Sequence, residues 1–168
     1  VITLIWVASG TVSMNPWGLL EGESSLQEQE ALRAGHLNWT EIRRVMQHAA
    51  QTSWPADTVQ LKLIKLAGES FLVATARDGR QTRYTPDTFA VATIDLPQLQ
   101  RLELSLLGQT PVIDSSLLVT EDAYYYDHRQ ALDFPVYRIR SADEQSRVYY
   151  LSGTTGELLK KVDSASRW

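Results

Sequence analysis

The stretch from Val59 to Thr85, VQLKLIKLAGESFLVATARDGRQTRYT, constrains the fold more than any other part of the chain. Apolar and polar residues alternate in VQLKLIKLA, which predicts a strand with one buried face. ESFLVATA predicts a second strand, and the Asp-Gly pair that follows it is the strongest short signal for a hairpin. QTRYT returns as a third strand that Pro86 closes. The sequence therefore predicts an antiparallel meander.

A helix is expected immediately before this meander, in LNWTEIRRVMQHAAQTSWP. Asn38 can cap the free backbone N–H groups at its start, and Glu41 stands at the position that completes a capping box. Apolar residues from Trp39 to Ala49 recur at helical spacing and form one stripe. Pro55 ends the helix.

The second half of the chain repeats this order. Asp95 caps a predicted helix in LPQLQRLELSLLG, and Gly108 stops it. Four strand patterns follow, at Ser116–Tyr126, Phe134–Arg140, Arg147–Leu151 and Glu157–Val162.

The predicted fold class is α+β, with two tandem units at residues 21–92 and 93–168, each a helix packed on an antiparallel sheet. Since one helix covers only one face of a small sheet, we expect the units to pack together or to leave outer faces for a partner.

Composition narrows the functional classes. Hydrophobic residues make up 43% and charged residues 21% of the chain, which is typical of a globular protein. The formal net charge is −4, with acidic and basic residues interspersed, so nucleic acid is not an expected partner. The absence of cysteine excludes disulfides, thiolate metal sites and cysteine nucleophiles.

The amino-terminal stretch VITLIWVASGTVSM carries no charge, and the first acidic or basic residue is Glu21. It is shorter than the roughly 20 apolar residues that cross a bilayer. We interpret residues 1–20 as the outer end of a transmembrane helix with its juxtamembrane loop, in which Trp6 and Trp17 suit the membrane–water boundary. The alternative is a buried amino-terminal strand, which the β-branched residues favour.

Four segments together resemble one known family: WVASGTVSMNPWG, LAGESFLVATARDG, DAYYYDHRQALDFPVYRIR and YYLSGTTGELLKK. They are similar to the PepSY-associated transmembrane family, iron-regulated proteins of the bacterial inner membrane whose periplasmic portion consists of PepSY domains between two membrane helices. The most specific element is the strand–turn–strand around Thr155-Gly156-Glu157. The first unit departs from this pattern, because YTPDTFAV contains no glycine.

The resemblance implies two PepSY-like units in the periplasm, attached to the inner membrane by flanking helices. It also implies a non-catalytic interaction or regulatory module with a protein partner, since PepSY domains occur in the propeptides of thermolysin-type peptidases and are proposed to restrain proteolysis. The alternative is the outer domain of a membrane-bound iron or siderophore reductase or uptake protein. Its haem would be held by membrane helices, so no cofactor is expected within this sequence. A third alternative is direct capture of a small anionic or metal-bearing ligand.

The run of three tyrosines is a candidate contact surface. On a strand, Tyr124 and Tyr126 would face one way and Tyr125 the other. Tyrosine combines a large apolar body with a hydroxyl that needs a partner, so the run suits a packed sheet or a partner contact. His128 follows in an expected hairpin loop, where Asp127 could raise its proton affinity.

Arg138 and Arg140 complete the candidate contacts, because they share one face of a predicted strand. They could grip an anionic ligand such as a ferric siderophore, although charges of this kind also protect sheet edges from pairing. His36, His48 and His128 have no recognisable metal-ligand spacing. Ser152 lies outside a nucleophile elbow. We therefore assign no catalytic, cofactor-binding or metal residue, and the domain is not expected to be an enzyme.

Overall fold

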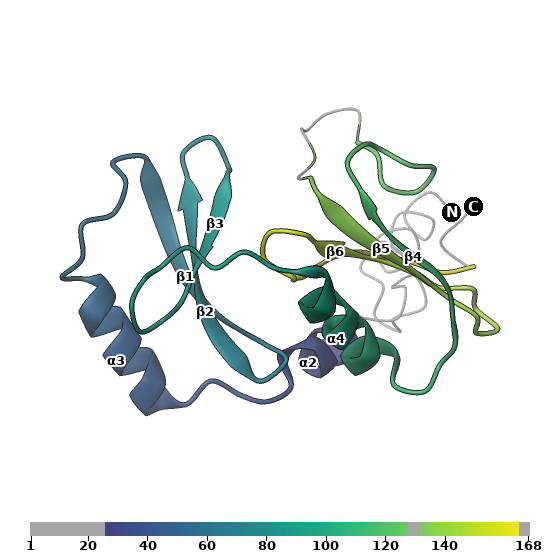
Figure 1. Cartoon of the computed structure of the whole chain (residues 1–168), viewed down its shortest axis with the longest axis horizontal. Helices are drawn as coiled ribbons and strands as arrows, with labels where there is room; N and C mark the ends of the chain where they lie inside the picture. The colour runs from purple at the N-terminus through teal and green to yellow at the C-terminus, as the bar shows by residue number, and fades with distance from the viewer. Residues whose placement is uncertain (1–25, 128–131, 133, 165–168) are drawn as a thin grey trace, which may run out of the picture.

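The structure, a computed structural model, describes residues 26–127, 132 and 134–164. It is an α+β fold with two antiparallel sheets that lie side by side (Figure 1). Sheet A has three strands in the order β1-β2-β3, and sheet B has four in the order β4-β5-β6-β7. The elements are α2 (Leu26–Arg33), α3 (Trp39–Ala49), β1 (Thr58–Leu66), β2 (Glu69–Ala76), β3 (Gln81–Tyr84), α4 (Leu96–Leu107), β4 (Val112–Leu118), β5 (Val136–Ser141), β6 (Val148–Ser152) and β7 (Leu158–Val162).

The predicted first helix and meander are confirmed. Asn38 caps α3, and its side chain accepts a hydrogen bond of 2.9 Å from the backbone N–H of Thr40. Helix α3 lies on the side of sheet A away from sheet B (Figure 1), where its buried Val45 belongs to the same apolar cluster as Leu72 of β2. Trp39, expected on the apolar stripe, is instead 69% exposed. The stripe that packs is therefore shorter than the sequence pattern suggested.

The predicted second helix is also confirmed. The Asp95 side chain accepts a hydrogen bond of 2.7 Å from the Gln98 backbone N–H, and the Gln98 side chain accepts one from the Asp95 N–H, which completes a capping box. Gly108 ends α4 with a positive φ of 59°.

The predicted strand at Ser116–Tyr126 is wrong in its second half, because β4 ends at Leu118. The Asp122 carboxylate accepts hydrogen bonds from the backbone N–H groups of Tyr124 (2.9 Å) and Tyr125 (2.8 Å). An aspartate that bonds the backbone two and three residues ahead stabilises a turn. This local bonding outweighs the strand preference of the tyrosines.

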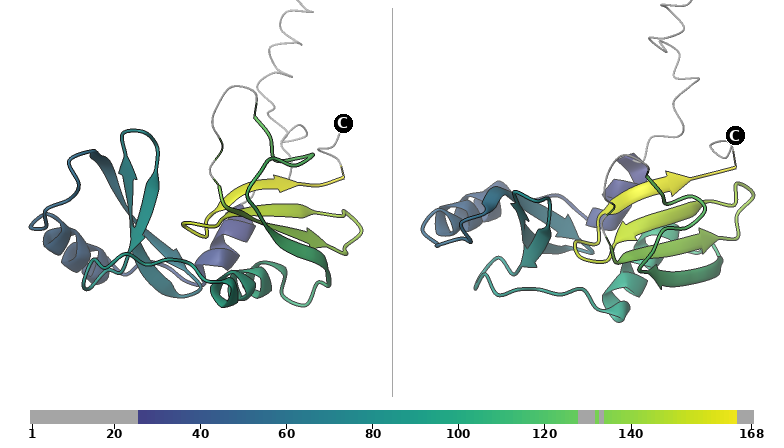
Figure 2. Two further views of the ribbon diagram at one scale, coloured as in Figure 1. Left: turned by 45° about the horizontal axis from the view of Figure 1, so that its top comes forward. Right: turned by 90° about the horizontal axis from the view of Figure 1, so that it is seen from above.

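The two sheets share one buried core. Leu66 and Phe71 of sheet A belong to the same apolar cluster as Tyr137 and Leu151 of sheet B. The expected contact between the two helix–sheet units is therefore present, while the boundary between residues 92 and 93 stays a prediction. Figure 2 shows α2 and α4 at the junction between the sheets.

Helix α2 connects the two sheets. The backbone N–H of Ala67, in the β1–β2 turn, donates a hydrogen bond of 2.8 Å to the Leu32 carbonyl at the end of the helix. Glu28 on the same helix pairs with Lys161 of β7, with 2.6 Å between Oε1 and Nζ, and these side chains are only 12% and 7% exposed. One short helix is thus held by sheet A at its end and by sheet B near its start.

The turn between β6 and β7 reaches toward sheet A (Figure 1). Gly156 in this turn has a φ of +79°, as expected for a tight turn. A Cβ at this position would lie 2.9 Å from Leu102 Cδ1 and 3.1 Å from Leu66 Cδ1. The glycine is therefore required both by its backbone conformation and by its close approach to the shared core.

None of the helices within the described ranges is long and apolar enough to cross a membrane. The predicted transmembrane remnant at residues 1–20 lies outside the described residues.

Candidate functional site

Among the described candidate contacts, the structure brings Tyr124 and Arg138 together at the Asp122 carboxylate, which accepts hydrogen bonds from the Tyr124 backbone N–H and from Arg138 Nη1. Tyr124 and Tyr126 are 37% and 50% exposed, although the chain forms a turn here and not the expected strand. Tyr125 is buried, and its ring stacks on that of Tyr150 with 5.1 Å between centroids. The tyrosine run therefore closes one face of sheet B with its middle residue, while the outer two rings remain at the surface. His128 lies outside the described residues.

Arg138 is held by acidic neighbours. Its Nη2 lies 2.7 Å from Asp114 Oδ2, and its Nη1 lies 3.2 Å from Asp122 Oδ2. Burial alone would lower the pKa of Arg138, but the hydrogen bonds to these two carboxylates raise it above its ordinary value. The guanidinium is thus occupied in fixing the loop after β4, whereas Arg140 is exposed. Within the described residues, the structure shows carboxylate partners for Arg138, and a shared contact of the two arginines with an anionic ligand stays a prediction.

The Asp122 carboxylate is the centre of that loop. Burial acts to raise its pKa, but the N–H groups of Tyr124 and Tyr125, the Tyr150 hydroxyl and Arg138 together bring the pKa below its usual value. The Tyr150 O–H donates to Asp122 Oδ1 at 2.9 Å. All these contacts support the fold of the loop, so we assign it a structural role.

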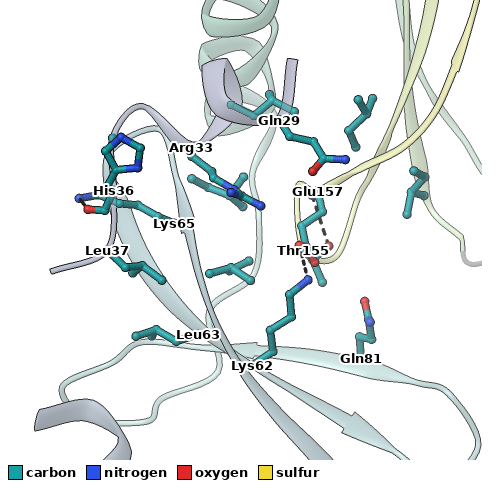
Figure 3. A pocket seen from close by; sticks show the side chains of 16 residues that line it. Gln29, Arg33, His36, Leu37, Lys62, Leu63, Lys65, Gln81, Thr155 and Glu157 are labelled. Atoms are coloured by element: carbon teal, nitrogen blue, oxygen red, sulfur yellow. Dashed lines mark hydrogen bonds and ion pairs between the residues drawn. The ribbon is translucent and has the colours of Figure 1, made fainter. Parts of the chain in front are cut away.

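A cleft with a volume of about 680 Å³ lies between the two sheets. We call it the inter-sheet cleft. One wall is formed by α2 and residues 35–37, and a second by Lys62–Leu66 of β1. The third is formed by residues 155 and 157 of the β6–β7 turn and by residues 158 and 159 at the start of β7. Figure 3 shows Arg33 and Lys62 directed into the space between these walls. Tyr124, Tyr126, Arg138 and Arg140 are not among its described lining residues.

The lining of the inter-sheet cleft is cationic although the chain is acidic overall. Arg33, Lys62 and Lys65 line it, and Glu157 is the one carboxylate among its described lining residues. Lys62 Nζ lies 2.6 Å from Glu157 Oε1, so this pair spans the cleft from β1 to the β6–β7 turn (Figure 3). Lys65 Nζ donates to the His36 carbonyl at 3.0 Å. In the described residues, Arg33 and Lys65 have no acidic partner.

The edge of β1 beside this cleft has a defined hydrogen-bonding pattern. Strands β1 and β2 are joined by the two-residue turn Ala67-Gly68, with φ values of 49° and 82°. Positive φ at both positions is typical of the tight hairpin turn that makes the flanking residues a hydrogen-bonded pair. Here those residues are Leu66 and Glu69.

Hydrogen-bonded and non-hydrogen-bonded pairs alternate along antiparallel strands. Since Leu66 is bonded to β2, the residues that direct their backbone N–H and C=O groups away from β2 are Lys65, Leu63 and Leu61. Strand β1 is at the edge of sheet A. These groups have no backbone partner within the part of the chain that the structure describes. The inter-sheet cleft therefore runs beside an open strand edge.

The hydroxyl groups near the cleft form hydrogen bonds with the backbone of the β6–β7 turn. Ser152 Oγ accepts hydrogen bonds from the backbone N–H groups of Thr154 (3.2 Å) and Thr155 (3.0 Å). Thr155 Oγ1 accepts one from the Glu157 N–H at 3.3 Å. These bonds shape the turn. Over the described ranges, no three histidine or acidic side chains gather in a way that could hold a metal ion.

A buried arginine, Arg83, serves the fold in a similar way. Burial lowers its pKa. Its Nε donates to the Ala92 carbonyl at 3.0 Å and its Nη2 to the Thr93 carbonyl at 2.9 Å, while the guanidinium lies 4.2 Å from the centre of the Phe71 ring. It fixes the connection from sheet A to α4.

The sequence patterns did not predict the inter-sheet cleft as a site. Its signal in the sequence is modest: Lys62 and Lys65 interrupt an otherwise apolar strand pattern, and Arg33 ends a weak helical pattern. Only the fold brings these residues together with Glu157. Comparisons with protein-family models, with curated proteins and with solved structures gave no match to this chain.

Proposed function

We propose that this chain is a non-catalytic, PepSY-type interaction module that holds an anionic partner in the inter-sheet cleft. The observation that carries the proposal is the charge of the lining: Arg33, Lys62 and Lys65 face one carboxylate, Glu157, in a chain with a net charge of −4. A cleft of one sign with low-dielectric walls concentrates ligands of the opposite sign.

The shape of the site supports the same role. A volume of about 680 Å³ lies within the range of ligand sites, and both sheets contribute to the walls. Lys62 and Lys65 project from β1 and Arg33 from the end of α2, so regular secondary structure sets the backbone positions of the cations before a partner arrives, which lowers the entropic cost of binding.

The resemblance to PepSY proteins extends the proposal to restraint of a peptidase in the periplasm, with the chain attached to the inner membrane. The role of outer domain in an iron or siderophore reductase depends on haem-bearing membrane helices outside the described residues, so it stays a prediction.

The test is binding of anionic probes at low ionic strength, measured by calorimetry. The probes are an oligoglutamate peptide, inorganic polyphosphate and citrate. We expect at least one to bind, and the double variant Arg33→Glu/Lys65→Glu to lose about tenfold or more in affinity. The control Arg43→Glu/Arg140→Glu makes the same charge change at exposed positions outside the cleft, and it should bind as the parent does. Absence of binding to every probe, or equal loss in both variants, would refute the proposal.

The peptidase role has its own assay. The chain is added to a thermolysin-type peptidase, and cleavage of a fluorogenic peptide is followed. We expect slower cleavage with the parent chain and normal cleavage with Arg33→Glu/Lys65→Glu. Normal cleavage with both would remove peptidase restraint from the proposal.

A further inference from the structure

We propose that the partner in the inter-sheet cleft is an acidic peptide segment in extended conformation, which adds as a strand to the open edge of β1. This inference rests on the proposed function above and specifies the chemistry of the partner.

The inter-sheet cleft runs along β1. Five consecutive residues, Lys62–Leu66, line it. At about 3.3 Å per residue they span about 13 Å, which matches several residues of an extended peptide. A compact anion such as citrate would fill only part of this length.

The strand edge offers main-chain hydrogen bonds. Leu63 and Lys65 direct their backbone N–H and C=O groups away from β2 and toward the open edge. An added strand satisfies such groups, and this pairing supplies affinity in the known mode of peptide recognition by strand addition. Polyphosphate and other anions without amide groups cannot complete the same pairs.

Lys62 and Lys65 project from opposite faces of sheet A, so an added strand would have a cation on each face. Lys62 and Ile64 project from one face of sheet A, and Leu63 and Lys65 project from the other, because neighbouring strand residues alternate. Consecutive side chains of an added peptide alternate in the same way. Carboxylates at neighbouring peptide positions would therefore meet Lys62 on one face and Lys65 on the other. This arrangement favours a run of acidic residues over a single charged group.

Glu157 competes with the partner. It lies 2.6 Å from Lys62 and holds that ammonium group in the absence of another carboxylate. A carboxylate of the bound peptide takes its place on Lys62. Glu157→Gln keeps the size of the side chain and removes its charge, so we expect it to tighten peptide binding by about threefold, in contrast to the loss expected for Arg33→Glu/Lys65→Glu.

The experiment compares three oligoglutamate peptides of equal length and charge. The first is unmodified, the second carries an N-methyl group on every second amide, and the third on every amide. An added strand pairs through one edge only, so the first two peptides should bind, and the third should lose about tenfold or more. Equal affinity of all three would overturn strand addition while leaving the proposed anion binding intact. Failure of all three, together with polyphosphate and citrate, would overturn both.

Amide hydrogen exchange of the complex with the unmodified peptide gives a second readout. We expect new protection at the backbone N–H groups of Leu63 and Lys65, whereas Lys62 and Ile64 are already bonded to β2 and should change little. Protection that does not alternate along β1, or that falls elsewhere, contradicts the proposed geometry.

Discussion

Sheets A and B are both antiparallel meanders, but other parts of the chain cover their faces and edges to different degrees. Sheet B is covered on one face by the shared core with α2 and α4, and on the other by the cluster around Tyr125 and Tyr150. Every residue of β6 is buried. Sheet A is covered by α3 on one face, and part of its second face and the edge of β1 border the inter-sheet cleft. The closed sheet acts as the support, and the open sheet carries the candidate site.

The two sheets also end differently. In sheet B, the turn containing Gly156 leads into β7 as a full fourth strand. In sheet A, the chain after β3 forms only an isolated bridge between Tyr84 and Val91. The intervening Phe89 adopts a positive φ of 51°, and its ring lies 5.2 Å from that of Trp54. The loop without glycine therefore serves the cluster beneath α3 and does not close a hairpin. Sheet A therefore ends at β3, at the edge opposite to the β1 edge that borders the inter-sheet cleft.

The largest effect is expected at the ion pair that joins sheet B to α2. Lys161→Met leaves the nearly buried Glu28 carboxylate without this partner, which should lower the free energy of unfolding by about 4 kcal/mol. Lys160→Met removes an exposed ammonium group from the neighbouring residue and is the control. Urea unfolding of both variants measures the difference. The double variant Glu28→Leu/Lys161→Met should recover most of the loss, and equal stability of the two single variants would contradict the structure.

The next largest effect is expected in the turn that reaches sheet A. Gly156→Val combines a strained φ with a clash against Leu102 and Leu66, which should cost about 3 kcal/mol. Gly79 has a similar φ of +89°, but a Cβ there meets nothing within 4 Å. Gly79→Val therefore measures the backbone strain alone. Thermal unfolding should show a clearly lower Tm for Gly156→Val, and matched Tm values would mean that close approach contributes nothing. We also expect Gly156→Val to harm folding more than His128→Ala.

A medium effect that depends on pH is expected in the loop over sheet B. The folded-state pKa of Asp122 is depressed, so its contribution to stability is present above the ordinary carboxyl pKa of about 3.9 and is lost as the pH falls through the folded value. Asp122→Asn should cost about 1–2 kcal/mol at neutral pH and reduce the loss of stability on acidification. Denaturant unfolding at several pH values tests this. A parallel pH dependence in parent and variant would exclude Asp122 as the source.

The smallest effect is expected at the ion pair across the inter-sheet cleft. Lys62 and Glu157 are separated by 2.6 Å, the same distance as Glu28 and Lys161, but their side chains are 53% and 30% exposed. Exposed pairs contribute less than about 1 kcal/mol. Lys62→Gln should therefore leave stability nearly unchanged while weakening peptide binding. A large loss of stability would show that the pair supports the fold and is not available to a partner.

Local signals predicted much of the fold. The helix caps at Asn38 and Asp95, the Asp-Gly hairpin and the alternation in β1 all act within a few residues, so their outcome does not depend on distant parts of the chain. The strand expected to reach Tyr126 failed because a second local signal was not recognised. Three tyrosines favour a strand, but the carboxylate of Asp122 bonds the backbone ahead of it and turns the chain.

The sequence by itself determined that this chain forms two helix-bearing antiparallel meanders, because helix caps, glycine turns and strand alternation are short-range properties. Only the tertiary structure decided which surfaces remain open. Arg33, Lys65 and Glu157 stand far apart in the chain, and they meet because α2 binds both sheets and the β6–β7 turn rests on the shared core. Their convergence depends on long-range burial of apolar surface, which no local pattern of residues encodes.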